Sequence, residues 1–338
     1  MSSGILIDVK VLRSCLEDLR PMFGKGNNLI PVLFKVKGNT LTVCCTSGCV
    51  YVNKLPITNE SGISTELTAQ YRNILDFLPK LGIVNLAIES YGLVISGEGT
   101  QIQLPVGYSI ITEPESYNVS FIDVDARTFP VGINSLLNIG LSGIYKVEKP
   151  FNIYGNISVI KYPNVIAQAR TPGLSVGVTL TQDYAKLLSK FNPDKVYSNG
   201  VDSLVLKRDS ATLELPAEPL KEENDFLKYM EGLSVPIRLN VEHYVDRLRN
   251  MNNLGNNVRA KITIFDDGVR VTAEQDNVSI AYDLGDCSGK LQRVFYLPML
   301  LYMSMVKALG NTTVEFLYGK EILCLRSPSL IIIARAIV

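Results

Sequence analysis

The feature that most constrains the fold of this chain is an internal repeat. Six short apolar segments of strand type begin near residues 5, 64, 119, 176, 237 and 294, so successive starts are 59, 55, 57, 61 and 57 residues apart. Each segment is followed by a stretch with helical periodicity and then by alternating, β-branched stretches that predict strands. A repeat of this length indicates a ring, a propeller or an array, and one helix per unit excludes an all-β propeller. The sequence therefore predicts an α+β fold of six strand–helix–strand units.

The helices are predicted where apolar residues recur at i, i+3, i+4 and i+7, because these positions share one face. In the second unit such a stripe is formed by Tyr71, Ile74, Leu75 and Leu78, and Pro79 is expected to kink the last turn. The six helices are predicted over residues 9–23, 69–81, 127–139, 182–191, 241–251 and 298–309.

Two stretches rich in proline or charge have the character of linkers, residues 107–118 and 216–232. They follow the second and the fourth unit, so the six units group in pairs. The sequence therefore predicts three domains, at residues 1–116, 117–232 and 233–338.

The charge balance restricts the kind of partner. Lys plus Arg and Asp plus Glu both number 33, whereas a protein that grips nucleic acid non-specifically is usually basic. Any non-specific binding to nucleic acid must therefore come from an uneven distribution of charge. The chain shows no signal-peptide pattern and no apolar run of about 20 residues, so we expect a cytoplasmic protein without a membrane partner.

The sequence makes no case for an enzyme, a metal or a cofactor. The six cysteines are expected to be reduced, and Cys44, Cys45 and Cys49 are interpreted as buried thiols in preference to a zinc site, because no second ligand pair follows. A single histidine, His243, excludes a His-paired nucleophile and a multi-histidine metal site. The run Asp266-Asp267-Gly268 predicts a hairpin, because Asp-Gly tolerates positive φ.

The repeat resembles the DNA sliding clamps, in the bacterial β-clamp arrangement of three domains per chain. The resemblance is topological and is closest in the last unit, in Val294-Phe-Tyr-Leu-Pro298, a helix ending Val306-Lys-Ala-Leu-Gly310 and an apolar strand at the chain end. It implies a homodimer of two chains closed head to tail into a ring around double-stranded DNA. The helices would line the hole, and the ring would act as a polymerase processivity factor in DNA replication.

Helices that face duplex DNA need one buried stripe and one cationic face, since phosphate attraction is independent of sequence and suits sliding. Acidic residues on the same helices dilute the field, so weak, transient DNA contact is expected. The candidate DNA-facing residues are Lys10, Arg13, Arg20, Arg72, Lys80, Arg127, Lys186, Lys190, Arg247, Arg249 and Lys307.

The resemblance also implies a hydrophobic cleft between the second and third domains for short peptides of polymerases and clamp loaders. The family's usual Gly-His-Arg and its Met-Pro and Arg-Leu endings are absent here. This departure and the neutral charge indicate a divergent clamp, of the kind a phage or mobile element would encode in a bacterial host. The positions that match the cleft are Tyr162, Pro163, Asn164, Val165, Ile166, Val235, Pro236, Ile332, Ile333, Ala334, Arg335, Ala336, Ile337 and Val338.

Two other interpretations of the sequence remain open. One is a clamp-fold interaction scaffold that regulates transcription or replication without processivity activity. The other is a β-rich virion protein, which would form large assemblies and show no topological link to DNA.

Overall fold

A computed structural model describes residues 5–23, 29–72, 74–115, 117–125, 127, 129–140, 149–171, 174, 176–254, 258–275, 278–310 and 313–337. By its internal contacts the chain divides into two compact units, Met1–Ala126 with Lys190–Glu218, and Arg127–Ser189 with Pro219–Val338. Helix α3 (Gln182–Phe191) and strand β18 (Glu218–Pro219) cross the boundary between these units. The three-domain organisation stays a prediction.

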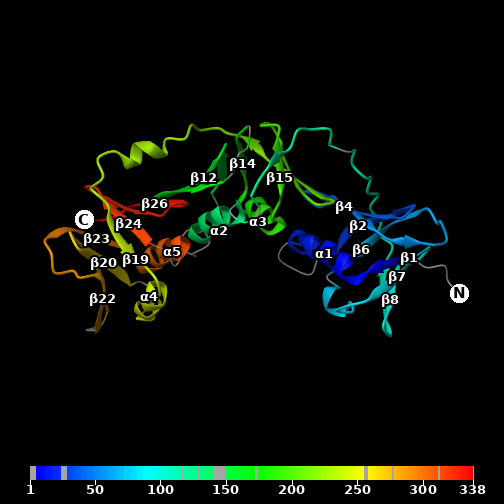
Figure 1. The fold of residues 1–338 in the computed structure, drawn as a ribbon, viewed down its shortest axis with the longest axis horizontal. Coiled ribbons are helices and arrows are strands. Elements are labelled where there is room, and N and C mark those ends of the chain that lie inside the picture. The colour runs from blue at the N-terminus through cyan, green and yellow to red at the C-terminus, as the bar shows by residue number, and fades with distance from the viewer. Residues whose placement is uncertain are drawn as a thin grey trace. The chain divides into compact units, whose positions relative to one another are not determined.

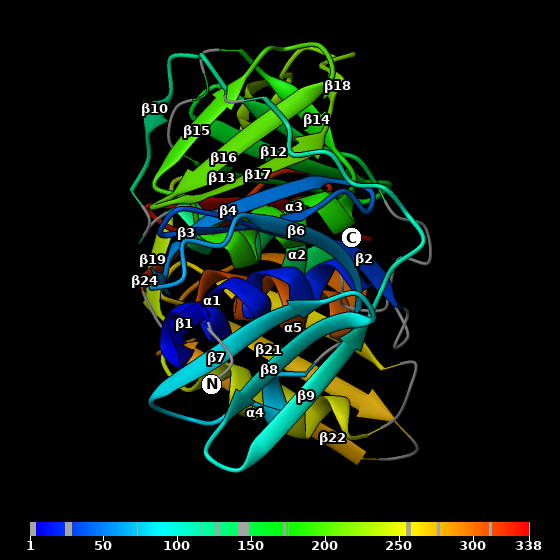
Figure 2. The ribbon, with the colours of Figure 1, turned by 90° about the vertical axis from the view of Figure 1, so that its right-hand side faces the viewer.

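The first unit contains two antiparallel sheets. In the smaller sheet, strands β7, β8 and β9 lie side by side (Figure 2). Its strand order is β5 (Thr58–Asn59), β1 (Ile5–Asp8), β7 (Ile83–Glu89), β8 (Gly92–Gly97) and β9 (Thr100–Pro105). The larger sheet has the order β10 (Ile122–Asp123), β15 (Lys195–Ser198), β16 (Ser203–Arg208), β17 (Ala211–Pro216), β4 (Val50–Pro56), β3 (Thr40–Cys45), β2 (Ile30–Lys37) and β6 (Thr65–Tyr71).

Helix α1 (Val9–Leu19) forms as its periodicity predicts, and the 3-10 helix η1 (Arg20–Phe23) extends it. Asp8 caps its N-terminus, with a carboxylate oxygen that accepts from the backbone N–H of Lys10 at 2.7 Å. The helix packs with one apolar face against the unit; its buried residues are Val9, Leu12, Cys15, Leu16 and Leu19.

The helix predicted over residues 69–81 is wrong. Thr65–Tyr71 is strand β6, which pairs with β2 from Ile30↔Tyr71 to Val36↔Thr65, and only the 3-10 helix η2 (Leu75–Phe77) follows. Leu78 is extended, as the residue before a proline prefers, so Pro79 ends the segment instead of kinking a helix. The stripe residues are nevertheless buried. The apolar positions were thus identified correctly, but backbone pairing with the edge of β2 makes this segment a strand instead of a helix.

The second unit also contains two antiparallel sheets. The larger one has the order β18, β14 (Val178–Leu180), β11 (Phe151–Tyr154), β12 (Ile157–Tyr162), β13 (Val165–Arg170), β26 (Leu330–Arg335), β25 (Ile322–Arg326), β24 (Thr313–Tyr318) and β19 (Ile237–Asn240). The smaller one has the order β22 (Val278–Gly285), β21 (Gly268–Gln275), β20 (Arg259–Phe265) and β23 (Leu291–Pro298).

Three helices of the second unit follow one another along its sheets, with α5 (Met299–Leu309) packed between α2 (Phe129–Gly140) and α4 (Tyr244–Asn252) (Figure 1). Helix α2 lies against β12 and β13, and α5 contacts β20, β23 and β25. These helices confirm the predictions for the third, fifth and sixth repeats, and α3 coincides with the predicted range 182–191. A further 3-10 helix, η3 (Phe226–Met230), lies in the predicted linker.

The hairpin at Asp266-Asp267-Gly268 is confirmed, since β20 and β21 pair from Ile264↔Val269 onward. The reason for its glycine differs from the prediction. Gly268 is not among the residues with positive φ; instead, a Cβ atom there would lie 2.6 Å from the carbonyl oxygen of Leu284. The close approach of two backbones therefore requires this glycine.

Main-chain pairing joins the predicted domains. Strand β17 pairs with β4, with Ala211 opposite Asn53, and β13 pairs with β26, with Val165 opposite Ala334. Each pairing continues one sheet across a predicted domain boundary. The boundaries are thus joined by backbone hydrogen bonds as well as by side chains.

Candidate functional site

The predicted DNA-facing cations differ in how far they are available to a ligand. Arg13 and Lys186 are half-buried, and the other candidates are exposed: Lys10, Arg20, Arg72, Lys80, Arg127, Lys190, Arg247, Arg249 and Lys307. Arg72 and Lys80 flank η2 and do not lie on a helix.

Several of these cations are engaged within the protein. Arg13 donates from Nη2 to the carbonyl oxygens of Leu78 at 2.9 Å and Pro79 at 3.2 Å, so it anchors α1 to the segment after η2. On α3, Lys186 pairs with Asp183, three residues earlier, at 2.6 Å.

Helix α4 carries two further engaged cations. Arg249 pairs with Asp246 at 2.9 Å, and the guanidinium of Arg247 lies 6.0 Å from the ring centre of Tyr282. Helix α2 carries no charged residue at all, and α5 contributes Lys307 alone. The cationic character of the helices is therefore modest, and each ion pair weakens it further.

The candidate cleft residues fall into two groups, and the structure brings the first group together. Residues 162–166 form the turn from β12 to β13, and β13 pairs with β26 so that Ile166 lies opposite Ile333. The backbone N–H of Arg335 donates to the carbonyl oxygen of Asn164 at 2.8 Å. Pro163 and Asn164 are exposed at this junction, whereas Tyr162 is buried and its hydroxyl accepts from Gln182 Nε2 at 2.6 Å.

The C-terminal residues of this group alternate between two faces of the sheet. Ile332 and Ala334 are fully buried, and Ala336 is nearly so. Arg335 is exposed and forms an ion pair with Glu321 at 3.0 Å. Ile337 is 63% exposed although its backbone pairs with Tyr296, so among the described C-terminal residues it is the apolar side chain most available to a partner. Val338 lies outside the described residues.

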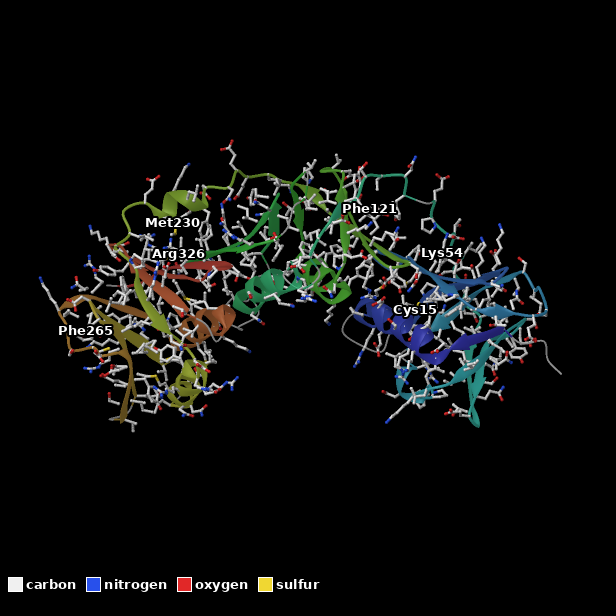
Figure 3. All side chains as sticks on the ribbon, viewed as in Figure 1. Cys15, Lys54, Phe121, Met230, Phe265 and Arg326 are labelled. Atoms are coloured by element: carbon white, nitrogen blue, oxygen red, sulfur yellow. The ribbon has the colours of Figure 1, made fainter. Side chains whose placement is uncertain are left out.

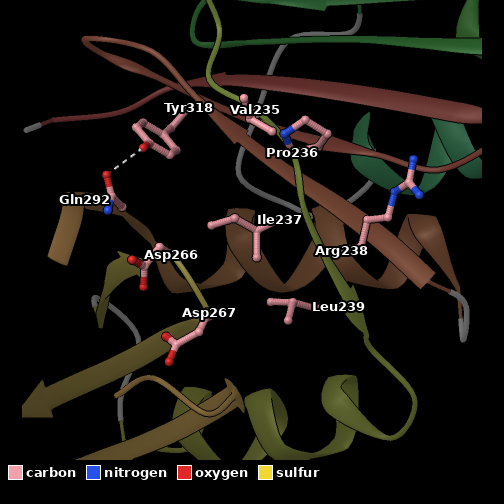
Figure 4. A pocket seen from close by; sticks show the side chains of 9 residues that line it. All are labelled: Val235, Pro236, Ile237, Arg238, Leu239, Asp266, Asp267, Gln292 and Tyr318. Atoms are coloured by element: carbon pink, nitrogen blue, oxygen red, sulfur yellow. Dashed lines mark hydrogen bonds between the residues drawn. The ribbon is translucent and has the colours of Figure 1, made fainter. Parts of the chain in front are cut away.

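Val235 and Pro236 lie elsewhere in the second unit. They line a cavity of about 600 Å³ together with Ile237, Leu239 and the hairpin carboxylates Asp266 and Asp267 (Figure 4). None of residues 162–166 or 332–337 lines this cavity. The structure therefore does not bring the interdomain pair to the turn and C-terminal residues.

Residues 221–233, all but the last of which belong to the predicted linker, cover part of the larger sheet in the second unit, and we call this segment the linker strap. Phe226 is fully buried in a cluster with Ile166 and Ile333, and Met230 and Leu233 pack against the same cluster. Lys161 on β12 holds the strap through Asp225 at 2.8 Å and Glu222 at 3.2 Å. Two predicted cleft residues, Ile166 and Ile333, are thus covered by the chain itself.

The ion pairs of the strap shift the pKa of their partners. Lys161 lowers the pKa of Asp225 below its usual value. Burial opposes the charge on Lys161, but Asp225 and Glu222 raise its pKa above the usual value. Both shifts favour the charged, paired state at neutral pH.

The described residues form no cluster of three or more metal-ligating side chains. All six cysteines are buried and free, and burial raises the pKa of Cys44 and Cys49 to about 12, so these thiols are protonated and unreactive. His243 precedes α4 in a left-handed conformation and lies 3.7 Å from Glu242. In the part of the chain described, no helix combines the length and apolar character needed to cross a bilayer.

Comparison with known proteins identifies the fold. No protein-family model and no curated protein sequence matches the chain. Its structure is similar to a DNA polymerase sliding clamp from Caulobacter crescentus, at 13% identity and TM-score 0.75 over 100% of both chains. A Helicobacter pylori beta clamp matches at 12% identity and TM-score 0.80, covering 99% of this chain and 100% of that one. A putative DNA polymerase III beta subunit from Eubacterium rectale matches at 13% identity and TM-score 0.77 over 99% of both chains. The chain therefore has the fold of the bacterial DNA polymerase sliding clamps.

Proposed function

We propose that this protein is a sliding clamp, a non-enzymatic ring that encircles duplex DNA and tethers a DNA polymerase. The observation that carries the proposal is the structural similarity to polymerase clamps over the entire length of both chains. The repeat of apolar-striped helices on antiparallel sheets supports it, because such helices leave one face free for DNA.

The sheet edges support closure of two chains into a ring. Strand β9 ends the smaller sheet of the first unit and carries no charged residue, and β22 ends the smaller sheet of the second unit with Asp283 as its single charge. Edge strands with few charged side chains invite pairing with another strand unless they are covered. Head-to-tail pairing of β9 with β22 of a second copy would cover both edges in a homodimer.

The test of ring closure combines solution mass with retention on DNA. We expect a dimer by light scattering and retention on a nicked circular plasmid that is lost when the plasmid is linearised. Ile102→Lys on β9 should give monomers without retention, whereas Val201→Lys, in an exposed loop between β15 and β16, should leave both properties unchanged. A monomer that never stays on circular DNA would refute the proposal.

The exposed helix cations are proposed to contact phosphate weakly. Lys10→Glu and Arg20→Glu together should shorten retention on circular DNA and flatten its salt dependence, because each lost phosphate contact removes a released counterion. Retention that is unchanged by both substitutions would remove these residues from the DNA surface.

The turn at 162–166 and the C-terminal residues are proposed to receive peptides of the polymerase and the clamp loader. Ile337→Ala should weaken binding of such peptides without unfolding the chain, because this apolar side chain is exposed. Unchanged affinity for every such peptide would refute this assignment. Primer extension with the cognate polymerase distinguishes a clamp from a scaffold. A scaffold would form the ring or bind the partner peptides, but it would not increase the length of the extension products.

A further inference from the structure

A groove of about 690 Å³ lies on the larger sheet of the second unit, and none of the residues predicted to bind DNA or peptide lines it. It is bordered by the turn from β11 to β12, the end of β13, and the turn from β25 to β26. Its charged lining residues are Arg170, Arg238, Arg326 and Glu315. Three positive charges against one negative charge leave the groove with a net charge of +2.

The strand register explains why these side chains gather. Residues directly opposite each other on adjacent strands share one face of a sheet. One row across β12, β13, β26, β25, β24 and β19 consists of Val159, Gln168, Ile331, Arg326, Glu315 and Arg238.

The next row on the same face is apolar over most of its length and belongs to the part covered by the linker strap. It consists of Lys161, Ile166, Ile333, Cys324 and Leu317. Figure 3 shows Met230 on the strap and Arg326 on the sheet. The groove is therefore the uncovered continuation of a face whose other part is already occupied.

The single carboxylate of the groove is fully engaged. Glu315 accepts from Arg238 Nε at 2.8 Å through one oxygen and from Arg326 Nε through the other. Burial opposes the charge on Glu315, but the two guanidinium groups lower its pKa below the usual value. The terminal nitrogens of Arg238 and Arg326, and the whole guanidinium of Arg170, have no partner within the described part of the chain. These donors are available to a ligand with several anionic oxygens.

The lining residues favour an acidic peptide over a nucleic acid as the anionic ligand. They include no Phe, Tyr or Trp on which the bases of a single strand could stack. Two of the three arginines, Arg238 and Arg326, are bridged by the one carboxylate, Glu315. The floor includes Ile157 and Ile331, which suit an aliphatic side chain.

The linker strap shows what this face of the sheet binds. Its carboxylates Glu222 and Asp225 pair with Lys161, and its Phe226 and Met230 pack on the apolar row. It is an acidic segment followed by apolar anchors. The groove offers the same combination, cations beside isoleucines, to a second segment.

We propose that this groove binds an acidic linear segment of a partner protein, with carboxylates on Arg170, Arg238 and Arg326 and an aliphatic side chain on Ile157 and Ile331. The interaction goes beyond the proposed clamp function and does not depend on ring closure. If the acidic segment does not bind, retention on the plasmid is unaffected. If the ring does not close, the groove can still bind the segment.

The experiment measures fluorescence anisotropy of a labelled acidic peptide, Ac-EDLEDL-NH2, with the full-length chain at low salt. Its neutral counterpart, Ac-QNLQNL-NH2, should bind much more weakly. Arg170→Glu should reduce affinity for the acidic peptide by about tenfold or more, as loss of a charge-assisted contact predicts. Since the Arg170 side chain is exposed and has no partner among the described residues, this substitution should not disturb folding.

The matched control is Arg259→Glu, the same charge change at an exposed position on β20, which should leave affinity unchanged. Equal losses for Arg170→Glu and Arg259→Glu would overturn the proposal, as would equal binding of the two peptides. Tighter binding of a single-stranded oligonucleotide than of the acidic peptide, lost in Arg170→Glu, would also overturn it in favour of nucleic acid.

Discussion

A buried ion pair in the first unit allows a quantitative test of the packing between predicted domains 1 and 2. Asp18 on α1 accepts from Arg208 Nη2 and from the Tyr51 hydroxyl at 3.0 Å. Arg208 also donates to the carbonyl oxygen of Phe191 at 2.6 Å and lies over the Phe191 ring. We predict that Arg208→Met destabilises this unit strongly, because it leaves the Asp18 carboxylate buried with one neutral donor.

The magnitude follows from the burial of the two partners. The Asp18 side chain is 10% exposed and that of Arg208 is 27% exposed. Removing one partner of a buried pair costs about 3–5 kcal/mol, and the partial exposure of Arg208 places the expected loss at the lower end, about 3 kcal/mol. The double variant Asp18→Asn with Arg208→Met should lose less than Arg208→Met alone, since no unpaired charge remains buried.

The pH dependence has a defined sign. Burial raises the pKa of Asp18 above its usual value, although Arg208 and Tyr51 act in the opposite direction. A carboxyl with a raised pKa in the folded state binds its proton more tightly when folded, so ionisation costs stability as pH rises through this range. Arg208→Met should raise the pKa of Asp18 further, and its stability deficit should therefore shrink at acidic pH.

Urea unfolding at pH 5 and pH 7 measures the differences in unfolding free energy. Hydrogen exchange of the α1 and β4 amides shows whether the loss is confined to this unit. The variants are Asp18→Asn, Arg208→Met and the double substitution. Equal losses in Arg208→Met and in the double variant, or a deficit independent of pH, would refute the view that an orphaned carboxylate causes the loss.

Three further predictions concern the strap and the thiols. Phe226→Ala should destabilise the second unit by about 3 kcal/mol and raise exchange of strap amides, because it empties a fully buried site; exposed Leu227→Ala is the matched control, and equal effects would contradict the packing. Because Lys161 lowers the pKa of Asp225, this pair should stabilise the fold above the usual pKa of Asp and lose that contribution as pH falls through the lowered value; Lys161→Met should abolish this acid-side component of unfolding. Since all six cysteines are buried, Ellman's reagent should label none of them in native protein and all of them in denaturant, and rapid native labelling would contradict the core assignment.

The residues that the sequence identified best are those whose pattern is local. The ranges of α1, α3 and α5 follow from apolar spacing within each segment, together with an N-cap at Asp8 and a glycine at Gly310 after α5. Residues 69–81 show the limit of such patterns. Their stripe is buried as predicted, but β2 offers Thr65–Tyr71 a ladder of backbone hydrogen bonds that no local pattern displays.

The candidate sites were less accessible to sequence reasoning, because they depend on register between distant strands. The resemblance to the clamps predicted one cleft from residues 162–166, residues 332–338 and the pair Val235 and Pro236. The structure pairs β13 with β26, but Val235 and Pro236 line a separate cavity. The groove was missed because its arginines are far apart in the chain. The available signal was the occurrence of Arg238, Glu315 and Arg326 at positions of otherwise apolar strands where charge is unexpected.

The sequence by itself determined the succession of strand and helix in five of the six predicted units, the α+β class and the apolar face of most helices, because each depends on residue order over a few turns or strands. The tertiary structure decided which segment became strand β6, how β13 met β26, and which charges came to lie side by side. A strand takes its partners from across the chain, and a shift of one residue would exchange its two faces. Register between distant strands therefore came from the tertiary structure, which places Arg238, Glu315 and Arg326 side by side in the open groove.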